Sequence, residues 1–169
     1  RNLLAFTAQT AGGSKKLMKL LIEQAEIDDK SGLLNRFAFC NAVKRFMENN
    51  YNSGFVIIRW DVDGFKVLND VYGMKEGDRF LRTIGDYIRR NFGEAVIAGR
   101  WEADHFVICM RRDHFNCNKM LEHIDQAVKE DDFGFDIIVR MGVYVVEDTS
   151  LDVAIMCDRA LMALKTIKG

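Results

Sequence analysis

The stretch Asp61–Asp78, DVDGFKVLNDVYGMKEGD, decides the fold more than any other part of the chain. It follows a nearly continuous apolar run, FVIIRW (residues 55–60), which has the length of a strand. Such a run is typical of a strand with both faces covered, so the strand is expected at the centre of its sheet. The strand ends directly on two aspartates, Asp61 and Asp63, and then on Gly64.

The end of this strand has the residue types that hold a metal ion and phosphates. Carboxylate oxygens suit Mg²⁺, which commonly takes one or two carboxylates and leaves its other positions to phosphates and water. Gly64 lets backbone N–H groups approach an anion closely, and a helix that starts near Phe65 adds the positive end of its dipole. The alternative is an ordinary surface turn that caps a helix, and this stretch alone leaves both interpretations open.

A second motif lies between the apolar runs AVIAG and FVICM, which together predict a hairpin over residues 97–108. A tight hairpin usually has Gly, Asn or Asp where φ is positive, whereas this tip carries Glu102 and Ala103. If the hairpin packs beside the central strand, Asp104 comes close to Asp61. Two carboxylates from adjacent strands are a common way to hold a nucleotide-bound metal.

The remaining elements complete an α+β pattern. Helices alternate with a mainly antiparallel sheet, so a sandwich of the ferredoxin-like or palm type is expected. Helices are expected over about 14–29, 35–49, 65–91 (interrupted near Gly73 and Gly77), 116–130 and 151–168, with the last strand at 136–147.

Composition narrows the class of protein. The chain has 169 residues, enough for one domain with its own core. Its net charge of −1 gives no electrostatic footprint for nucleic acid, and its longest apolar runs are too short to span a bilayer. No nucleic-acid partner and no membrane contact by this segment are therefore expected. A cytoplasmic location is expected for the segment, also where the full-length protein is anchored in a membrane. The four cysteines have no metal-ligand spacing.

Together the motifs resemble the GGDEF, or diguanylate cyclase, domain family. DDKSGLLNR is similar to the family's opening D-x-L-T-G-L-x-N-R, and Asp61–Asp78 is similar to D-x-D-x-F-K-x-x-N-D-x-x-G-H-x-x-G-D. GRWEADHF stands where the family has R-x-G-G-D-E-F, and VRMGVY and CDRALMALKTIKG are similar to its S-x-G strand and closing helix. The resemblance implies a domain over residues 28–169, built on a five-stranded sheet flanked by helices. Residues 1–27 are then a linker or signalling helix from an upstream region.

The resemblance also implies a reaction and a set of site residues. In that family two GTP molecules, one on each subunit of a dimer, are joined into cyclic di-GMP with Mg²⁺ or Mn²⁺. Asp104 would take the acidic signature position used in catalysis. The metal would be held by Asp61, the backbone of Val62 and Asp104, and the nucleotide by the backbone at Phe65 and by Lys66, Asn69, Asp78 and Lys165.

The signature loop departs from the family pattern. Glu102 and Ala103 replace two glycines and His105 replaces a glutamate, whereas Asp104 and Phe106 are kept. A glutamate beside a triphosphate at about 4 Å, with an effective dielectric near 20, costs roughly 4 kcal/mol. An imidazole is a poorer partner than a carboxylate for Mg²⁺. The loop is therefore interpreted as a degenerate signature on an otherwise intact frame.

Other positions depart as well. Met74 stands where the family has His, and Arg140 stands where it has a small Ser. The family's product-inhibition motif, R-x-x-D, is replaced at Gly93 and Val96, so that inhibitory site is not expected here.

Three functions remain open. The first is a catalytically silent regulatory module that binds GTP or dimerises through the domain and its upstream helix, next to an EAL phosphodiesterase domain. The second is an active diguanylate cyclase that tolerates the altered loop. The third is a palm-fold enzyme of altered specificity, against which the retained guanine-reading pair, Asn69 and Asp78, argues. Glu102 and His105 discriminate between the first two.

Overall fold

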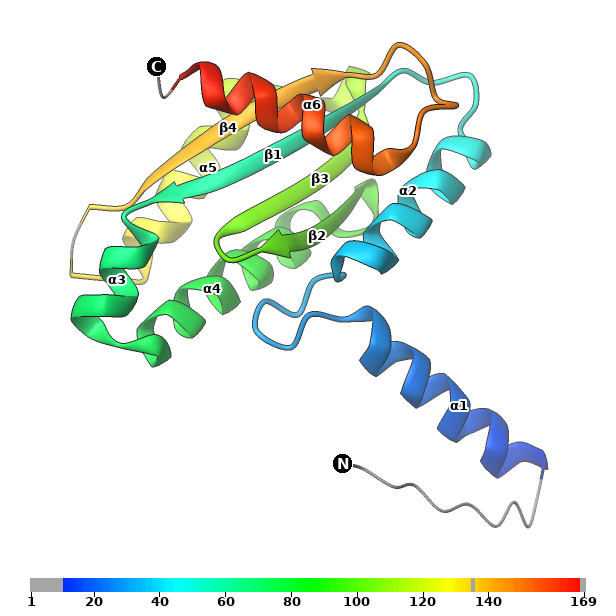
Figure 1. Ribbon diagram of the computed structural model, residues 1–169, viewed down its shortest axis with the longest axis horizontal. Helices are drawn as coiled ribbons and strands as arrows, with labels where there is room; N and C mark the ends of the chain where they lie inside the picture. Colours follow the sequence, from blue (N-terminus) through cyan, green and yellow to red (C-terminus); the bar gives the residue numbers. More distant parts are fainter. Residues whose placement is uncertain (1–10, 135, 168–169) are drawn as a thin grey trace.

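The computed structural model describes residues 11–134 and 136–167, which form a four-stranded sheet with helices on both faces (Figure 1). The strand order is β2-β3-β1-β4, and all neighbouring strands are antiparallel. The strands are β1 (Phe55–Asp63), β2 (Val96–Glu102), β3 (His105–Arg111) and β4 (Ile138–Val145). The α-helices are α1 (Ala11–Glu26), α2 (Arg36–Asn49), α3 (Phe65–Tyr72), α4 (Met74–Phe92), α5 (Cys117–Glu130) and α6 (Val153–Thr166).

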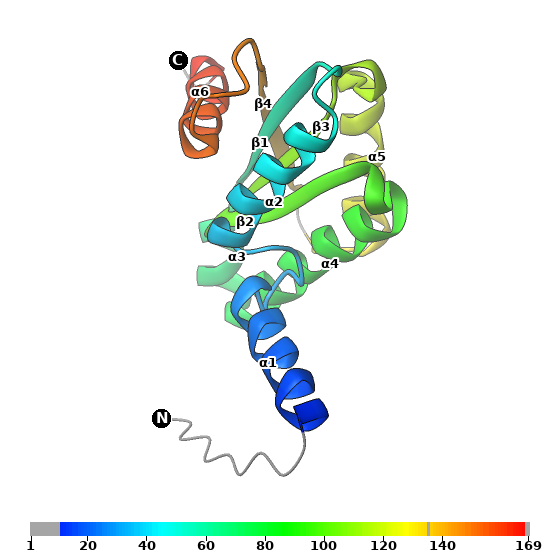
Figure 2. The ribbon, with the colours of Figure 1, turned by 90° about the vertical axis from the view of Figure 1, so that its right-hand side faces the viewer.

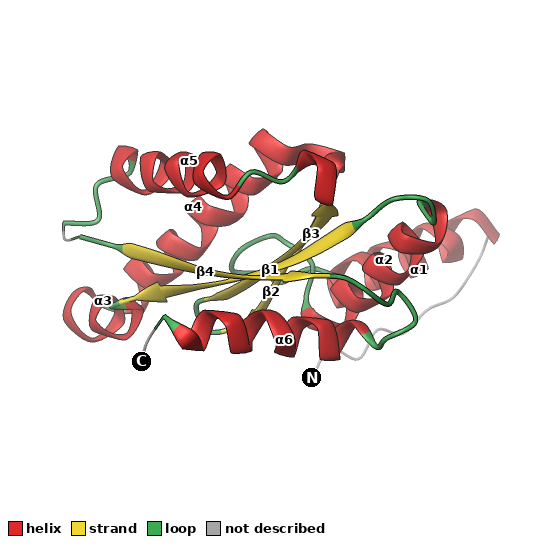
Figure 3. Ribbon diagram, turned by 90° about the horizontal axis from the view of Figure 1, so that it is seen from above, coloured by secondary structure: helices red, strands yellow, loops and turns green. Residues whose placement is uncertain are grey.

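The central position expected for the apolar strand is confirmed, because β1 lies between β3 and β4. Its side chains alternate between two cores: Val56 and Ile58 pack with residues of α4 and α5, while Phe55 and Ile57 pack with residues of α2 and α6. Figure 3 shows α4 and α5 on one side of the sheet and α6 on the other, and α2 shares the core under α6. Coverage on both faces explains why the run is apolar at nearly every position.

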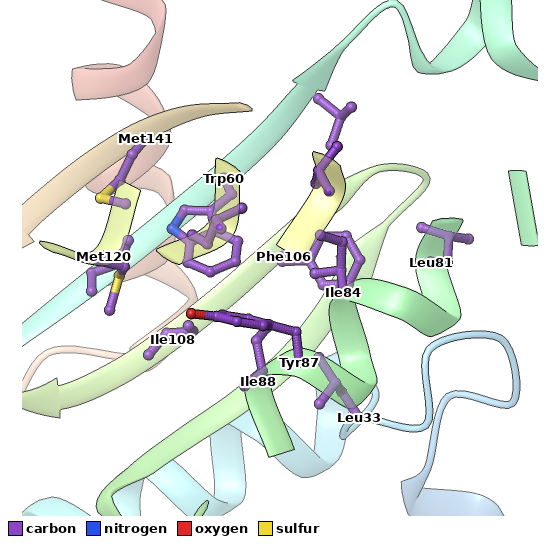
Figure 4. Packing of buried hydrophobic residues seen from close by; sticks show 14 of the residues in the cluster. Leu33, Trp60, Leu81, Ile84, Tyr87, Ile88, Phe106, Ile108, Met120 and Met141 are labelled. Atoms are coloured by element: carbon purple, nitrogen blue, oxygen red, sulfur yellow. The ribbon is translucent and has the colours of Figure 1, made fainter. Parts of the chain in front are cut away.

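The larger core lies under α4 and α5. Aromatic and aliphatic side chains of the strands meet the buried stripe of α4, as Figure 4 shows for Trp60, Phe106 and Ile108 against Ile84, Tyr87 and Ile88. This packing fixes the ends of β1 and β3, and with them the residues expected at the site.

The α+β class is confirmed, but the expected count of five strands is wrong: the described residues form four. Beyond β2 the described part of the chain continues the sheet as two isolated bridges, one between Gly99 and Leu34 and one between Leu34 and Ile27. Leu34 N donates to Ala98 O, and Arg100 N donates to Leu34 O. The segment at Leu34 does not lengthen into a strand, because the next residue, Asn35, caps α2.

The helices differ from expectation in two places, Gly77 and the bounds of the first helix. Gly73 separates α3 from α4 at φ +90°, as expected. Gly77 interrupts nothing: it lies inside α4, where a Cβ would overlap the side-chain oxygen of Asn69. The first helix runs over 11–26 rather than 14–29. Of the last expected helix, Lys168 lies outside the described residues.

Helix α1 projects away from the body of the domain in two perpendicular views (Figures 1 and 2). Its exposed apolar side chains include Met18, Leu20 and Ile22. Among the described residues, no helix combines the length and the apolar character needed to cross a membrane.

Candidate active site

The candidate site lies where β1 ends, beside the tip of the β2–β3 hairpin and the first half of β4 (Figure 1). The antiparallel register fixes this arrangement: Trp60 faces Phe106 of β3 across one ladder, and Asp61 faces Arg140 of β4 across the other. Because side chains alternate along a strand, Asp61 and Asp63 share the sheet face covered by α2 and α6.

The three residues expected to hold a metal are brought together. Asp61 is 2% exposed near the end of β1, and the backbone N–H of Val62 donates to Asp104 Oδ2 at 2.8 Å. The hairpin therefore delivers Asp104 to the end of β1, as expected from the sequence. The acceptor atoms are of the hard oxygen type that Mg²⁺ prefers.

A positive charge already faces these carboxylates. The Arg140 guanidinium lies with Nη2 2.7 Å from Asp63 Oδ1 and Nε 3.7 Å from Asp61 Oδ1. Residues 11–134 and 136–167 contain no group of three or more His, Cys, Asp or Glu side chains arranged to hold a metal. The donor types fit a divalent ion, but the charge does not, so an ion would have to displace Arg140.

The signature hairpin turns on two residues, Ala103 and Asp104, between β2 and β3. Ala103 has φ +44°, in the region that glycine favours, so the alanine adopts the backbone conformation of the glycine that it replaces. Arg100 links the tip of the hairpin to the segment before α2. Its Nε donates to Ala103 O at 2.8 Å, and its Nη1 lies 2.9 Å from Asp28 Oδ1. Burial alone would raise the pKa of Asp28, but hydrogen bonds from Ser31 and the Arg100 charge outweigh it and lower that pKa.

The two replaced polar residues of the signature both contact one buried arginine. Arg59, on β1, is 1% exposed; its Nε donates to His105 Nδ1 at 3.3 Å, and its Nη2 lies 3.5 Å from Glu102 Oε1. The guanidinium also lies 5.4 Å from the centre of the Trp101 ring. Burial lowers the pKa of Arg59, and Glu102 opposes that shift. Arg59 was not among the site residues predicted from the sequence, although an arginine inside an apolar strand is the signal that points to it.

His105 is held neutral by its surroundings. Its Nδ1 accepts the Arg59 N–H, which requires a ring nitrogen without a proton. Burial lowers the pKa of His105, and Asp104 opposes the shift without overcoming it. The lone pair on Nδ1 is therefore directed to Arg59 and away from any metal at Asp61.

The residues expected to bind phosphates lie around this corner. Gly64, at φ +81°, precedes α3, and the Phe65 ring packs 6.0 Å from Phe80 between centres, which anchors the first turn. Lys66 is exposed on that turn. Lys165 is exposed in the last turn of α6, which lies toward the end of the sheet where β1 ends (Figure 1).

The residues expected to read guanine come from neighbouring helices. Asn69 of α3 packs against Gly77 of α4, and its Oδ1 is buried without a hydrogen-bond partner in the described part of the chain. Asp78, one residue further along α4, pairs with Lys30 Nζ at 3.1 Å. A ligand that used Asp78 would compete with Lys30, which the sequence did not predict.

Comparison with known sequences gives a consistent result. A model of the family described as "Diguanylate cyclase, GGDEF domain" matches residues 25–169. Diguanylate cyclase DgcS of Shewanella oneidensis is 33% identical over 108 residues, covering 62% of this chain and 36% of that protein. Cyclic di-GMP phosphodiesterase NbdA of Pseudomonas aeruginosa is 28% identical over 114 residues, covering 65% of this chain and 14% of that protein. The matched part of the chain thus spans 36% and 14% of the lengths of these two relatives.

Solved structures show the same fold. The coiled coil and GGDEF domain of DgcB from Caulobacter crescentus, in complex with c-di-GMP, has a TM-score of 0.76 at 20% identity, covering 93% of this chain and 87% of that one. The S helix-GGDEF-EAL protein LapD from Vibrio cholerae has a TM-score of 0.72 at 20% identity, covering 94% of this chain and 38% of that one.

Proposed function

The chain belongs to the GGDEF family of diguanylate cyclase domains, and on this premise we propose that it is a catalytically silent member that regulates cyclic-di-GMP signalling. It acts by binding GTP or by dimerising, through the domain of residues 28–169 and the helix before it. The proposed location is cytoplasmic. An adjacent EAL phosphodiesterase domain is the proposed target, in an arrangement like the one named for LapD.

One observation carries the proposal: Glu102 and His105 both bind the buried Arg59. The two side chains that replace the signature glycine and glutamate serve as partners of a core charge. A hairpin committed to such an internal role is poorly suited to accommodate a reacting triphosphate. Phosphoryl transfer depends on positioning and on neutralising charge in the transition state, and these changes disturb both.

The expected loss of turnover has three contributions, all in the signature loop. Of the two residues that replace the signature glycines, Glu102 is the one that adds a negative charge. Its side chain is 64% exposed, so water and Arg59 weaken its repulsion of phosphates. The repulsion by Glu102, the strain at Ala103 and the carboxylate lost at His105 together remove about 5 kcal/mol of transition-state stabilisation. This loss slows turnover by three to four powers of ten.

The proposed ligand is GTP with Mg²⁺ or Mn²⁺. Phosphates are assigned to the Phe65 backbone, Lys66 and Lys165, and the guanine edge to Asn69 and Asp78. The buried Asn69 Oδ1, which has no partner in the described part of the chain, supports this assignment. If the side chain rotates out from under Gly77 to meet a ligand donor, a cost of about 1–3 kcal/mol is relieved.

Calorimetry of the whole chain with GTP and with ATP, each in Mg²⁺, tests the ligand. GTP is expected to bind at least about tenfold more tightly than ATP, since adenine lacks the donors that guanine offers to these two side chains. Asn69→Ala is expected to abolish the difference, whereas Asn41→Ala, at an exposed position on α2, leaves it intact. Equal affinities for the two nucleotides, or no effect of Asn69→Ala, would rule out the guanine assignment.

An active diguanylate cyclase is the second candidate. The observation in its favour is the retained contact between the Val62 N–H and Asp104, with Asp61 beside it. Product formation from GTP decides between the two candidates.

A further inference from the structure

The ion pair between Asp61 of β1 and Arg140 of β4 is a consequence of the strand register. Asp61 and Arg140 are direct cross-strand partners, so the register itself puts the guanidinium beside the buried carboxylate. The Arg140 side chain is 22% exposed and Asp61 only 3%, while Asp63 is 55% exposed. The arginine thus spans from a buried anion to one at the surface.

We propose that Arg140 is a built-in counter-cation at the Asp61 carboxylate, which takes the place of a divalent metal ion and makes metal binding at this site weak. The inference goes beyond the proposed function, because it concerns the protein and the metal alone, without nucleotide. Arg140 is thereby a residue that sets the cation specificity of the site.

Burial supplies the reason for such an ion. An uncompensated carboxylate in the protein interior is strongly destabilising, so Asp61 needs a cation in every state of the folded domain. A bound metal provides that cation only while metal is present, whereas an arginine on the neighbouring strand provides it always.

The same guanidinium opposes a second cation. A divalent ion roughly 4 Å from a guanidinium, even with the dielectric constant of water, loses about thirtyfold in affinity. A shorter distance or lower dielectric increases the loss. An ion that displaced the guanidinium would also have to break the 2.7 Å contact with Asp63.

Titration with Mn²⁺ alone, followed by electron paramagnetic resonance of the free ion, tests the proposal on the whole chain. Wild type is expected to show no saturable site. Arg140→Gln, which removes the charge, is expected to gain a saturable site that holds Mn²⁺ at least about thirtyfold more tightly than any residual binding by wild type. Arg140→Lys keeps the charge and is expected to bind as weakly as wild type. Adding Asp61→Asn to Arg140→Gln is expected to remove the new site.

Thermal unfolding provides a second readout that holds even if the variant is unstable. In EDTA the melting temperature of Arg140→Gln is expected to fall below that of wild type, and Mn²⁺ is expected to restore it, because a ligand stabilises the state that binds it. The wild-type melting temperature is expected to be unaffected by Mn²⁺. If Arg140→Gln folds only with Mn²⁺, the proposal is supported.

Two results would overturn the proposal. One is saturable Mn²⁺ binding by wild type that Asp61→Asn abolishes. The other is an Arg140→Gln variant that gains neither affinity nor stability from Mn²⁺. Neither result bears on GTP preference or product formation, so failure here is distinguishable from failure of the proposed function.

Discussion

At the scale of single residues, Arg59 explains the changes in the signature loop. A guanidinium buried in a sheet needs partners, since removing one partner of a buried charge is far more costly than the pair is worth. Here the partners are Glu102, His105 and the Trp101 ring. The loop residues and Arg59 therefore form one interacting set, in which changing any member alters what the others contribute.

A double-mutant cycle tests this coupling. Glu102→Gly with His105→Leu is expected to lower the free energy of unfolding by about 2 kcal/mol in wild type, because Arg59 then lies buried with fewer partners. In an Arg59→Met background the same pair of changes is expected to cost less than about 1 kcal/mol. Urea unfolding measures both differences, and equal costs in the two backgrounds would show that the residues are independent.

The pH dependence of stability is the second test at this scale. Burial lowers the pKa of His105 below its ordinary value of 6.5; Asp104, Asp61 and Glu102 oppose that shift, and Arg59 adds to it. Below about pH 6.5 the unfolded chain therefore takes up a proton that the folded protein does not bind, and the free energy of unfolding decreases as the pH is lowered.

His105→Gln should remove part of that fall. The variant is expected to lose less stability than wild type between pH 7 and about pH 5, and to parallel wild type above about pH 8, where the imidazole is neutral in both states. Parallel curves across the whole range would show that His105 takes up its proton equally in both states.

At the scale of elements, the sequence predicted what local chemistry determines. Asn35 and Asn116 start α2 and α5 as side-chain caps, and Gly73 ends α3 at a positive φ. The mistaken break at Gly77 arose because glycine has a second use, the close approach of another side chain, which only the packed helices reveal. The missing fifth strand likewise depends on how the segment at Leu34 meets the sheet edge.

Gly142 on β4 determines how closely α6 packs on the sheet. A Cβ at this position would lie 2.6 Å from Leu164 N and would also overlap Ala160 O, both backbone atoms of α6. Gly142→Ala is expected to lower the free energy of unfolding by about 2 kcal/mol or more, as overpacking against rigid backbone does. Gly54→Ala is the matched control, since its nearest neighbour is Arg112 Cβ at 3.5 Å. Similar thermal unfolding of the two variants would contradict this account of the α6 interface.

At the scale of the whole molecule, the sheet register assembles the site from distant parts of the chain. The sequence predicted that the hairpin brings Asp104 to Asp61, because both motifs end on strands of one sheet. It did not predict that Glu102 meets Arg59, 43 residues away, or that Arg140 meets Asp61 and Asp63. Those pairings depend on which strands are neighbours and on side-chain direction, which residue spacing alone does not give.

These pairings determine how much activity a repaired signature is expected to have. Restoring Glu102→Gly, Ala103→Gly and His105→Glu alone removes Glu102 from Arg59, leaves Arg59 beside the new carboxylate at position 105, and leaves Arg140 at Asp61. Little activity is therefore expected from that triple variant. Adding Arg59→Met and Arg140→Ser removes both obstacles and is the combination expected to recover product.

The most direct test of the central claim is cyclic di-GMP formation by the unmodified chain, fused to a coiled coil that forces dimerisation and supplied with GTP and Mg²⁺ or Mn²⁺. Product is separated by chromatography and compared with an active family member under the same conditions. Catalytic silence predicts turnover at least about a thousandfold below that reference, from a loss of about 5 kcal/mol. Robust product from the unmodified chain would contradict the account and establish the active cyclase in its place.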